Sequence, residues 1–216
     1  MMRHVTQPRT VVGDRRPPSR GDRQRALIID GVAELLADVP IANLSVSRVA
    51  EHVGVTRPAF YFYFESKYAV VAAALEEVWA EIDAATADLA SYDFAEPPAQ
   101  FSDRIITAVI EVWLRHYPVL RACLQARESD EQLSELWGRF IGNLSAKLSA
   151  FIDMLNTDGR ARPAIADTAA LTQALLGMTI WALHEQHVGA QPASSERVMA
   201  AVRAVWLASA WGVTGD

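Results

Sequence analysis

Residues 45–67, which read SVSRVAEHVGVTRPAFYFYFESK, decide how the rest of the chain is organised. Ser45 suits a helix N-cap, and the apolar residues that follow it recur at helical spacing. Gly54 suits the end of that first helix, and Thr56 offers a second N-cap just before Pro58, which a first helical turn tolerates. Two short helices joined by a tight turn that contains glycine are typical of a helix-turn-helix.

The second of these helices is predicted over Arg57 to Phe64, and its last five residues are all aromatic. Such a run could also form a β-strand, because aromatic residues are enriched in strands. Pro58 and the helical pattern on both sides favour a helix. One face of that helix would anchor it on its own core, while tyrosine hydroxyls on another face would reach phosphate oxygens. The pattern therefore favours a recognition helix over an aromatic-rich core helix.

The stretch GVTRPAFYFYFESK, residues 54–67, resembles the signature of the TetR family of transcriptional regulators. That signature runs Gly-Val-x-x-x-x-Leu/Phe-Tyr-x-His/Tyr-Phe-x-x-Lys, and the likeness is strong over about residues 24–68. The FYFYF-x-SK form, the arginines of the amino-terminal segment and the tryptophans further along the chain resemble the EthR-type repressors more narrowly. The resemblance implies a dimeric DNA-binding regulator that responds to a ligand.

The same resemblance assigns the residues that would contact double-stranded operator DNA. Arg57 is expected to hydrogen-bond guanine, Pro58 to touch a thymine methyl, and Ser47 to occupy another base-facing position. Phosphate contacts are expected from Ser45, Thr56, Tyr61, Tyr63 and Lys67.

Charge is distributed unevenly along the 216 residues, whose formal net charge is −6. Residues 1–67 hold ten Arg and Lys against seven Asp and Glu, a balance of +3, whereas residues 68–216 hold ten against nineteen, a balance of −9. A basic part on an acidic body indicates that one end of the chain meets nucleic acid, although chance alone could also produce this asymmetry.

The chain contains one cysteine, Cys123, so an intrachain disulfide cannot form and a reducing cytoplasm is the expected compartment. This cysteine is either a redox sensor or a small buried residue on a helix. No apolar run approaches the roughly 18 residues that a membrane helix needs, and the amino terminus lacks the apolar region of a secretory signal.

Three parts are expected along the chain: a basic arm over 1–21, a helix-turn-helix DNA-binding head over 22–67, and a ligand-binding and dimerisation body over 68–216. The arm is rich in Pro and Gly and carries five arginines, so it is either a solvated tail or an arm along the DNA backbone or minor groove. Asp22 is predicted to cap the first helix.

The expected fold is all-α, with about nine helices and no credible strand. The helices are predicted over 23–38, 46–53, 57–63, 66 or 67 to about 90, 101–116, 118–126, 131–156, 167–188 and 195–211. The fourth helix is continuous with the head, so a tilt of this helix would move the head.

The six tryptophans all follow the head, and they either fill an ordinary core or surround a large apolar pocket for a small molecule. In the EthR-type proteins that the chain resembles, an apolar tunnel runs among the middle helices. By register with them, the lining positions are Phe101, Ile105, Val109, Trp113, Trp137, Ile141, Leu144, Leu148, Leu176, Thr179 and Trp206. Leu176 and Thr179 stand where those relatives have amides, which implies a more apolar ligand.

The last two helices carry apolar residues that could pair with those of a second copy in a four-helix interface, or could instead close the core of one monomer. The residues concerned are Leu171, Leu175, Met178, Val198, Val202 and Val205. The mechanism implied by the resemblance is a population shift, in which a hydrophobic effector wedges the middle helices and tilts the fourth helix. The resemblance favours a repressor that the effector releases from a palindromic operator, and an activator stays open as the alternative at this point.

No cofactor and no metal are expected, because His184 and His187 are not the i, i+4 pair that places two ligands on one helical face. No phosphate-binding glycine loop and no catalytic constellation can be defended. A helical enzyme or a helical apolar-ligand-binding protein without a DNA role remains the alternative, and the stretch at 54–67 weighs against it.

Overall fold

The computed structural model describes residues 19–93, 95–188 and 195–212. These residues form nine α-helices and two short 3-10 helices and contain no strand, which confirms the predicted all-α fold. The elements are α1 (Arg20–Asp38), η1 (Ile41–Asn43), α2 (Val46–His52), α3 (Arg57–Tyr63), α4 (Lys67–Ala85), η2 (Ala87–Ser91), α5 (Pro98–Arg115), α6 (Tyr117–Ala126), α7 (Glu131–Thr157), α8 (Thr168–Val188) and α9 (Ser195–Trp211). Most of the predicted arm, residues 1–18, and the predicted loop at 189–192 lie outside the described residues.

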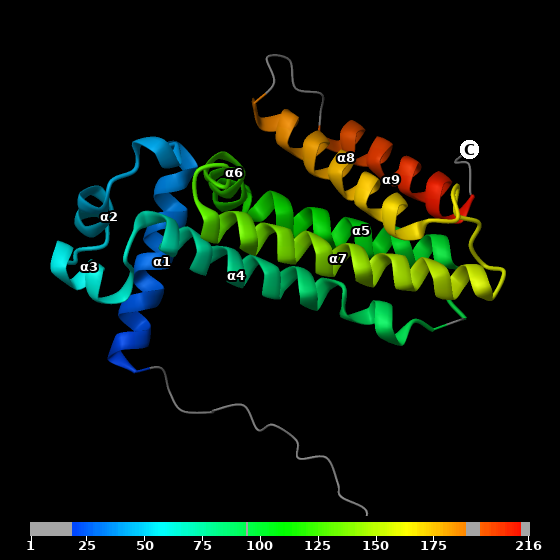
Figure 1. Cartoon of the computed structure of the whole chain (residues 1–216), viewed down its shortest axis with the longest axis horizontal. Helices are drawn as coiled ribbons and strands as arrows, with labels where there is room; N and C mark the ends of the chain where they lie inside the picture. Colours follow the sequence, from blue (N-terminus) through cyan, green and yellow to red (C-terminus); the bar gives the residue numbers. More distant parts are fainter. Residues whose placement is uncertain (1–18, 94, 189–194, 213–216) are drawn as a thin grey trace, which may run out of the picture.

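The helices α1, α2 and α3 form a small head at one end of the molecule (Figure 1). The Ser45 hydroxyl accepts a hydrogen bond from the Arg48 amide at 3.2 Å, and the Thr56 hydroxyl accepts one from the Ala59 amide at 3.3 Å. Gly54 between them has a φ of +70°, a conformation that glycine adopts without strain. The residues expected from the sequence therefore cap the two helices of the helix-turn-helix and form the turn between them.

The prediction that Asp22 caps α1 is wrong, because α1 begins earlier and its N-cap is Ser19. The Asp22 amide donates to the Ser19 hydroxyl at 3.1 Å, and the Ser19 amide donates to the Asp22 carboxylate at 2.9 Å. These reciprocal bonds form a capping box, and the hydrogen bonds from Ser19 lower the pKa of Asp22. Asp22 therefore stabilises the helix from its third position.

Two further boundaries differ from the prediction. The fourth helix ends at Ala85 rather than near Ala90, and the Thr86 hydroxyl that follows donates to the carbonyls of Ile82 at 2.9 Å and Asp83 at 3.2 Å in its last turn. A 3-10 helix, η2, then continues the chain in a new direction. The fifth helix begins at Pro98 rather than Phe101, in agreement with the tolerance of a first helical turn for proline.

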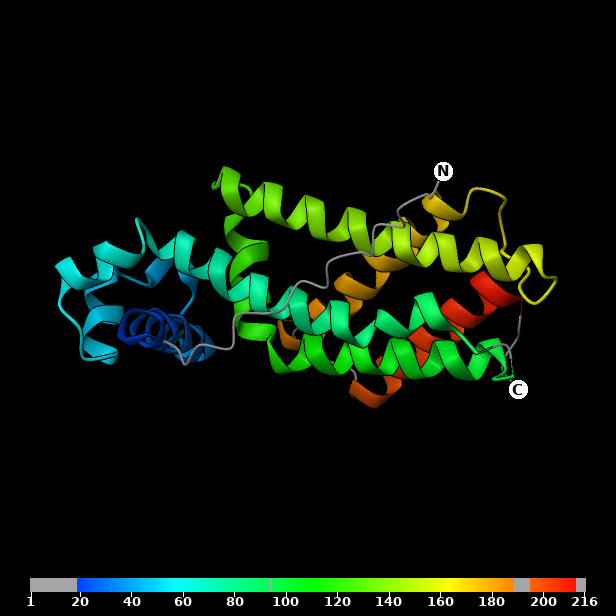
Figure 2. The ribbon, with the colours of Figure 1, turned by 90° about the horizontal axis from the view of Figure 1, so that it is seen from below.

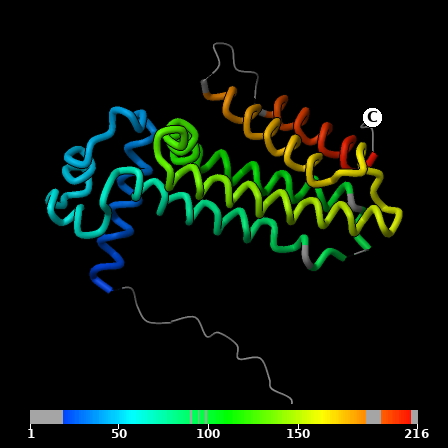
Figure 3. The backbone as a smooth tube through the Cα atoms, viewed as in Figure 1, coloured from blue at the N-terminus to red at the C-terminus, as the bar shows by residue number. Residues whose placement is uncertain are grey.

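The fourth helix leaves the head and runs into a body in which α5 and α7 lie alongside it (Figures 1 and 2). The short helix α6 lies across the end of the body that faces the head, where it contacts α1, α4 and η1. The backbone trace in Figure 3 shows α8 and α9 together on one side of this bundle. Among the described residues, no helix has the length and apolar character needed to cross a membrane.

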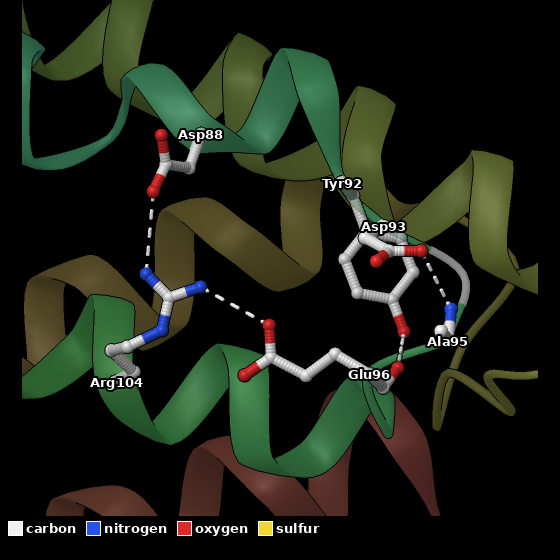
Figure 4. Close-up of polar contacts among 6 residues, drawn as sticks. All are labelled: Asp88, Tyr92, Asp93, Ala95, Glu96 and Arg104. Atoms are coloured by element: carbon white, nitrogen blue, oxygen red, sulfur yellow. Dashed lines mark hydrogen bonds and ion pairs between the residues drawn. The ribbon is translucent and has the colours of Figure 1, made fainter.

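One large hydrophobic core joins the head to the body, and a second, smaller core lies at the end of the body away from the head. Figure 4 shows the polar contacts over this second core, where the Arg104 guanidinium lies 3.3 Å from the Asp88 carboxylate and 3.1 Å from that of Glu96. The hydroxyl of Tyr92 also donates to the Glu96 carbonyl. Hydrogen bonds to Glu96 and Asp88 raise the pKa of Arg104. The contact between Arg104 on α5 and Asp88 on η2 links these two helices.

Candidate nucleic-acid interface and apolar cavity

The recognition helix α3 divides its aromatic run between two faces. Phe60 and Phe64 are buried against the rest of the head, whereas Arg57, Pro58 and Tyr61 are exposed. Because successive helical residues are about 100° apart, the exposed residues share one arc of the helix surface. The sequence pattern predicted this division between anchoring and outward-facing residues.

The other residues predicted to meet DNA lie on the same head, in different degrees of exposure. Ser47 is exposed on α2, and the exposed Ser45 and Thr56 act as N-caps through their hydroxyls. Tyr61 is 48% exposed, whereas Tyr63 is half-buried and donates a hydrogen bond from its hydroxyl to the Gln24 side chain at 3.5 Å. These contacts leave the hydroxyl of Tyr61 as the more accessible of the two phenols.

Lys67 lies at the first position of α4, and its ammonium group is directed toward the head. The Nζ atom donates to the carbonyl oxygens of Ile41 at 2.6 Å, Ala42 at 3.3 Å and Leu44 at 2.9 Å. Burial lowers the pKa of Lys67. A lysine has three N–H donors, so all of them are used within the protein. The residue predicted to bind phosphate thus ties α4 to the segment that precedes α2.

Phe62 is the outward-facing residue that sequence reasoning missed. Its side chain is 80% exposed, in contrast to the neighbouring phenylalanines. The signal was present in the sequence, because Phe62 follows Pro58 by four residues and therefore lies on the same face of a helix.

A narrow apolar cavity of about 60 Å³ lies within the body, between η2, α5, α7, α8 and α9. Seven of the predicted lining residues form part of its wall, and these are Ile105, Val109, Leu144, Leu148, Leu176, Thr179 and Trp206. The wall is completed by residues that the register did not suggest, namely Thr86, Leu89, Ser102, Ile106, Ile110, Phe151, Ile152 and Trp211. The helix end at Thr86 and the short η2 helix bring the first two of these to the cavity.

Four predicted lining residues lie elsewhere. Phe101 packs against Tyr92 in the second core, with ring centroids 4.8 Å apart. Trp113 and Trp137 contact each other edge to face at 6.1 Å, and both are buried in the larger core. Ile141 and Trp137 border a separate, open groove beside α8. The tryptophans therefore divide between packing and the cavity wall.

Several polar groups of the cavity wall are hydrogen-bonded within the protein, whereas the buried indole N–H of Trp211 has no hydrogen-bond partner among the described residues. The Trp206 indole donates to the Thr179 hydroxyl at 2.9 Å, and that hydroxyl donates to the Leu175 carbonyl at 2.8 Å. The Thr86 hydroxyl is likewise bonded to backbone carbonyls. None of the described residues that line the cavity is charged. This wall suits a neutral, apolar molecule.

Cys123 is buried on α6, and burial raises the pKa of its thiol to about 12. The thiol is therefore protonated at neutral pH, which favours the packing role over redox sensing. Within the described residues, no three His, Cys, Asp or Glu side chains lie close enough together to hold a metal ion. His184 instead bonds the Tyr117 hydroxyl through Nδ1 at 3.1 Å.

Comparison with known proteins agrees with this geometry. Residues 28–74 match the family described as bacterial regulatory proteins of the tetR family, and residues 102–212 match the C-terminal domain of the transcriptional regulator EthR. The HTH-type transcriptional regulator EthR of Mycobacterium tuberculosis H37Rv is 34% identical over 202 residues, which cover 90% of each chain. The chain belongs to the TetR family. The predicted resemblance to EthR-type regulators is thereby confirmed.

A further relative and two solved structures extend this result. The EthR of Mycolicibacterium smegmatis is 28% identical over 98% of this chain and 97% of its own. A TetR transcription regulator from Haloarcula marismortui superposes with a TM-score of 0.70 at 17% identity, covering 87% of this chain and 96% of its own. The regulator PfmR from Thermus thermophilus gives a TM-score of 0.65 at 21% identity, covering 85% of this chain and 96% of its own. These two structures share the fold of this helix-turn-helix transcriptional regulator.

Proposed function

We propose that this TetR-family regulator is a repressor that binds a palindromic operator as a homodimer and is released by a hydrophobic small molecule. The observation that carries the proposal is the position of α4. Its first residue, Lys67, is bonded to the head, and Thr86, which follows its last residue, lines the apolar cavity. A molecule in the cavity would therefore act on the helix that holds the recognition face.

On the DNA side, the exposed arc of α3 supports the base contacts implied by the family signature. Arg57 would hydrogen-bond guanine and Pro58 would contact a thymine methyl, while Ser47 on α2 would face the same groove. Ser45, Thr56, Tyr61 and Tyr63 would contact phosphates. Lys67 would act by fastening the head to α4 through its bonds to η1.

On the effector side, the narrowness of the cavity supports a mechanism in which binding widens the body. A ligand larger than the existing space would separate α5, α7 and α8 and displace the end of α4. The 19 residues of α4 span about 28 Å, so a small tilt at one end moves the head at the other. The effector shifts the equilibrium only by its differential affinity for the two forms.

A second connection between body and head runs through α6. The Arg121 guanidinium donates to the Leu36 carbonyl at 2.5 Å, in the last turn of α1. This bond satisfies a carbonyl that the helix end leaves without an intrahelical partner. The head would therefore follow movements of both α4 and α6.

The outer face of α8 and α9 supports dimerisation. Trp181 on α8 is 65% exposed and borders a groove toward α6 and α7, while Val205 on α9 is 39% exposed and borders a second groove between α8 and α9. Leu175 and Val202 are buried inside the monomer. Large exposed apolar side chains beside such grooves mark interaction sites. A two-fold dimer through this face would present two copies of α3 to a palindromic operator, with centres about 34–36 Å apart.

Trp181→Arg should convert the dimer to a monomer without unfolding the protein, because the side chain is exposed in the monomer but would be buried at the interface. Sedimentation equilibrium measures the change in mass. A variant that sediments as the same dimer as the wild type would move the interface away from α8.

The proposed function is tested by a mobility-shift assay on the DNA upstream of this chain's own coding region. Arg57→Ala should lower discrimination between the operator and a duplex with the contacted guanine replaced, by about 1–3 kcal/mol. Arg162→Ala, an exposed arginine in the loop after α7, serves as the matched control and should change nothing. Equal losses of affinity on both duplexes would mean that Arg57 does not read a base.

A further inference from the structure

The exposed face of α3 presents an apolar pair in addition to its polar side chains. Phe62 is 80% exposed, and Pro58, four residues earlier, is exposed beside it. Side chains four residues apart are neighbours on a helix surface, so the two form one apolar strip. Neither is buried against the other residues that the structure describes.

The Phe62 ring is supported on one side. It contacts the Tyr63 ring edge to face, with centroids 5.0 Å apart and an angle of 85° between planes. Tyr63 is in turn bonded through its hydroxyl to Gln24 of α1. This contact orients the ring of Phe62 while leaving most of its surface open to a partner.

The neighbours of this strip suit DNA as its occupant. Arg57 and Tyr61 lie on the same exposed arc, and the exposed arginines Arg23 and Arg25 lie in the first turns of α1. An apolar strip beside arginines matches a major groove, in which the thymine methyl is the apolar group among polar base edges.

We propose that Phe62 contacts a thymine 5-methyl group in the major groove. Together with Pro58, it makes operator binding depend on the presence of the thymine 5-methyl groups at the contacted positions. This inference rests on the proposed DNA-binding function and adds to it the chemical group that is read. Four residues of helix rise about 6 Å, close to two steps of about 3.4 Å along a strand. The two side chains therefore reach methyl groups about two base pairs apart.

The test uses a duplex that the full-length wild-type chain selects from a random pool. Each thymine is then replaced singly by deoxyuridine, which removes the methyl group and leaves the base pairing and hydrogen-bonding groups unchanged. Replacement at the two contacted positions should weaken wild-type binding about three- to fivefold each, the effect expected for burying one methyl group.

Phe62→Ala should bind the thymine duplex about three- to fivefold more weakly and lose the effect of deoxyuridine at one position only. Pro58→Ala should lose it at the other position. Because Phe62 is so exposed, Phe62→Ala should keep the wild-type melting temperature, and Phe62→Leu, which retains an apolar side chain, should keep part of the methyl dependence.

Two results would overturn the inference while the proposed function stands: wild-type affinity that is indifferent to every deoxyuridine, or a Phe62→Ala variant with undiminished sensitivity at all positions. Loss of self-association in Phe62→Ala, with DNA binding intact, would also overturn it and make the strip a protein contact. Failure of the wild-type chain to select any duplex would instead overturn the proposed function.

Discussion

Val109→Trp should leave the melting temperature of the protein nearly unchanged and weaken its binding to operator DNA about tenfold or more, with no effector present. Val109 is half-buried on α5 and lines the apolar cavity, so the larger ring enters space that the effector would use. This expected loss of operator affinity lies within the range of roughly 5- to 150-fold that is usual for coupling between two binding sites. Thermal unfolding and operator affinity are measured on the same preparation.

Val112→Trp is the matched control for this substitution. Val112 lies on the same helix, three residues further on, but is buried in the packed core and does not line the cavity. Overpacking there should cost about 1–3 kcal/mol of the free energy of unfolding, which lowers the melting temperature by roughly 2–12 °C in a protein of this size. If Val109→Trp lowers the melting temperature as much as Val112→Trp does, the cavity cannot accept an effector at this position.

Lys67→Ala should destabilise the protein, because it removes three hydrogen bonds between a charged group and the carbonyls around η1. One such bond contributes about 1.5–3 kcal/mol, and the three share one ammonium group, so their contributions do not add. The melting temperature should fall by roughly 3–12 °C. Operator affinity should fall with it, because α4 no longer holds the head in place.

Lys147→Ala uses the only other lysine of the chain as a control. Lys147 pairs with Asp83 at 2.6 Å on the surface of the body, where both side chains are largely exposed. Since exposed ion pairs contribute little, this variant should keep its melting temperature within about 2 °C of the wild type. If Lys67→Ala keeps its stability but loses about one unit of the salt dependence of DNA binding, Lys67 binds phosphate as the family signature implies.

The local features of the head could be predicted from the sequence because they depend on neighbouring residues. The caps at Ser45 and Thr56 and the turn at Gly54 each act within a few positions of the chain. The sequence alone favours Asp22 over Ser19 as the cap of α1, because both residue types suit an N-cap. Only the reciprocal hydrogen bonds show that Ser19 is the N-cap and that Asp22 is the third residue of the helix.

The wall of the cavity was less predictable, because five elements far apart in the sequence contribute to it. Register with the EthR-type proteins, which the chain resembles, placed Val109 and Leu176 at the wall, and both residues line the cavity. Register could not separate the wall from the packed core behind it, so Trp113 and Trp137 were assigned to the pocket although they contact each other. Nor could it find Leu89, because its place depends on the end of α4 at Thr86.

The sequence by itself determined that this chain is an all-helical TetR-family regulator with a recognition helix after Gly54, because spacing and residue type within one short stretch specify that motif. Only the tertiary structure decided how single side chains are used. The Lys67 ammonium meets three carbonyls that precede it by more than twenty residues, and Phe62 stays exposed because no other element of the described part of the chain covers it. Such outcomes depend on which segments the fold brings together, a property that no local pattern of residues contains.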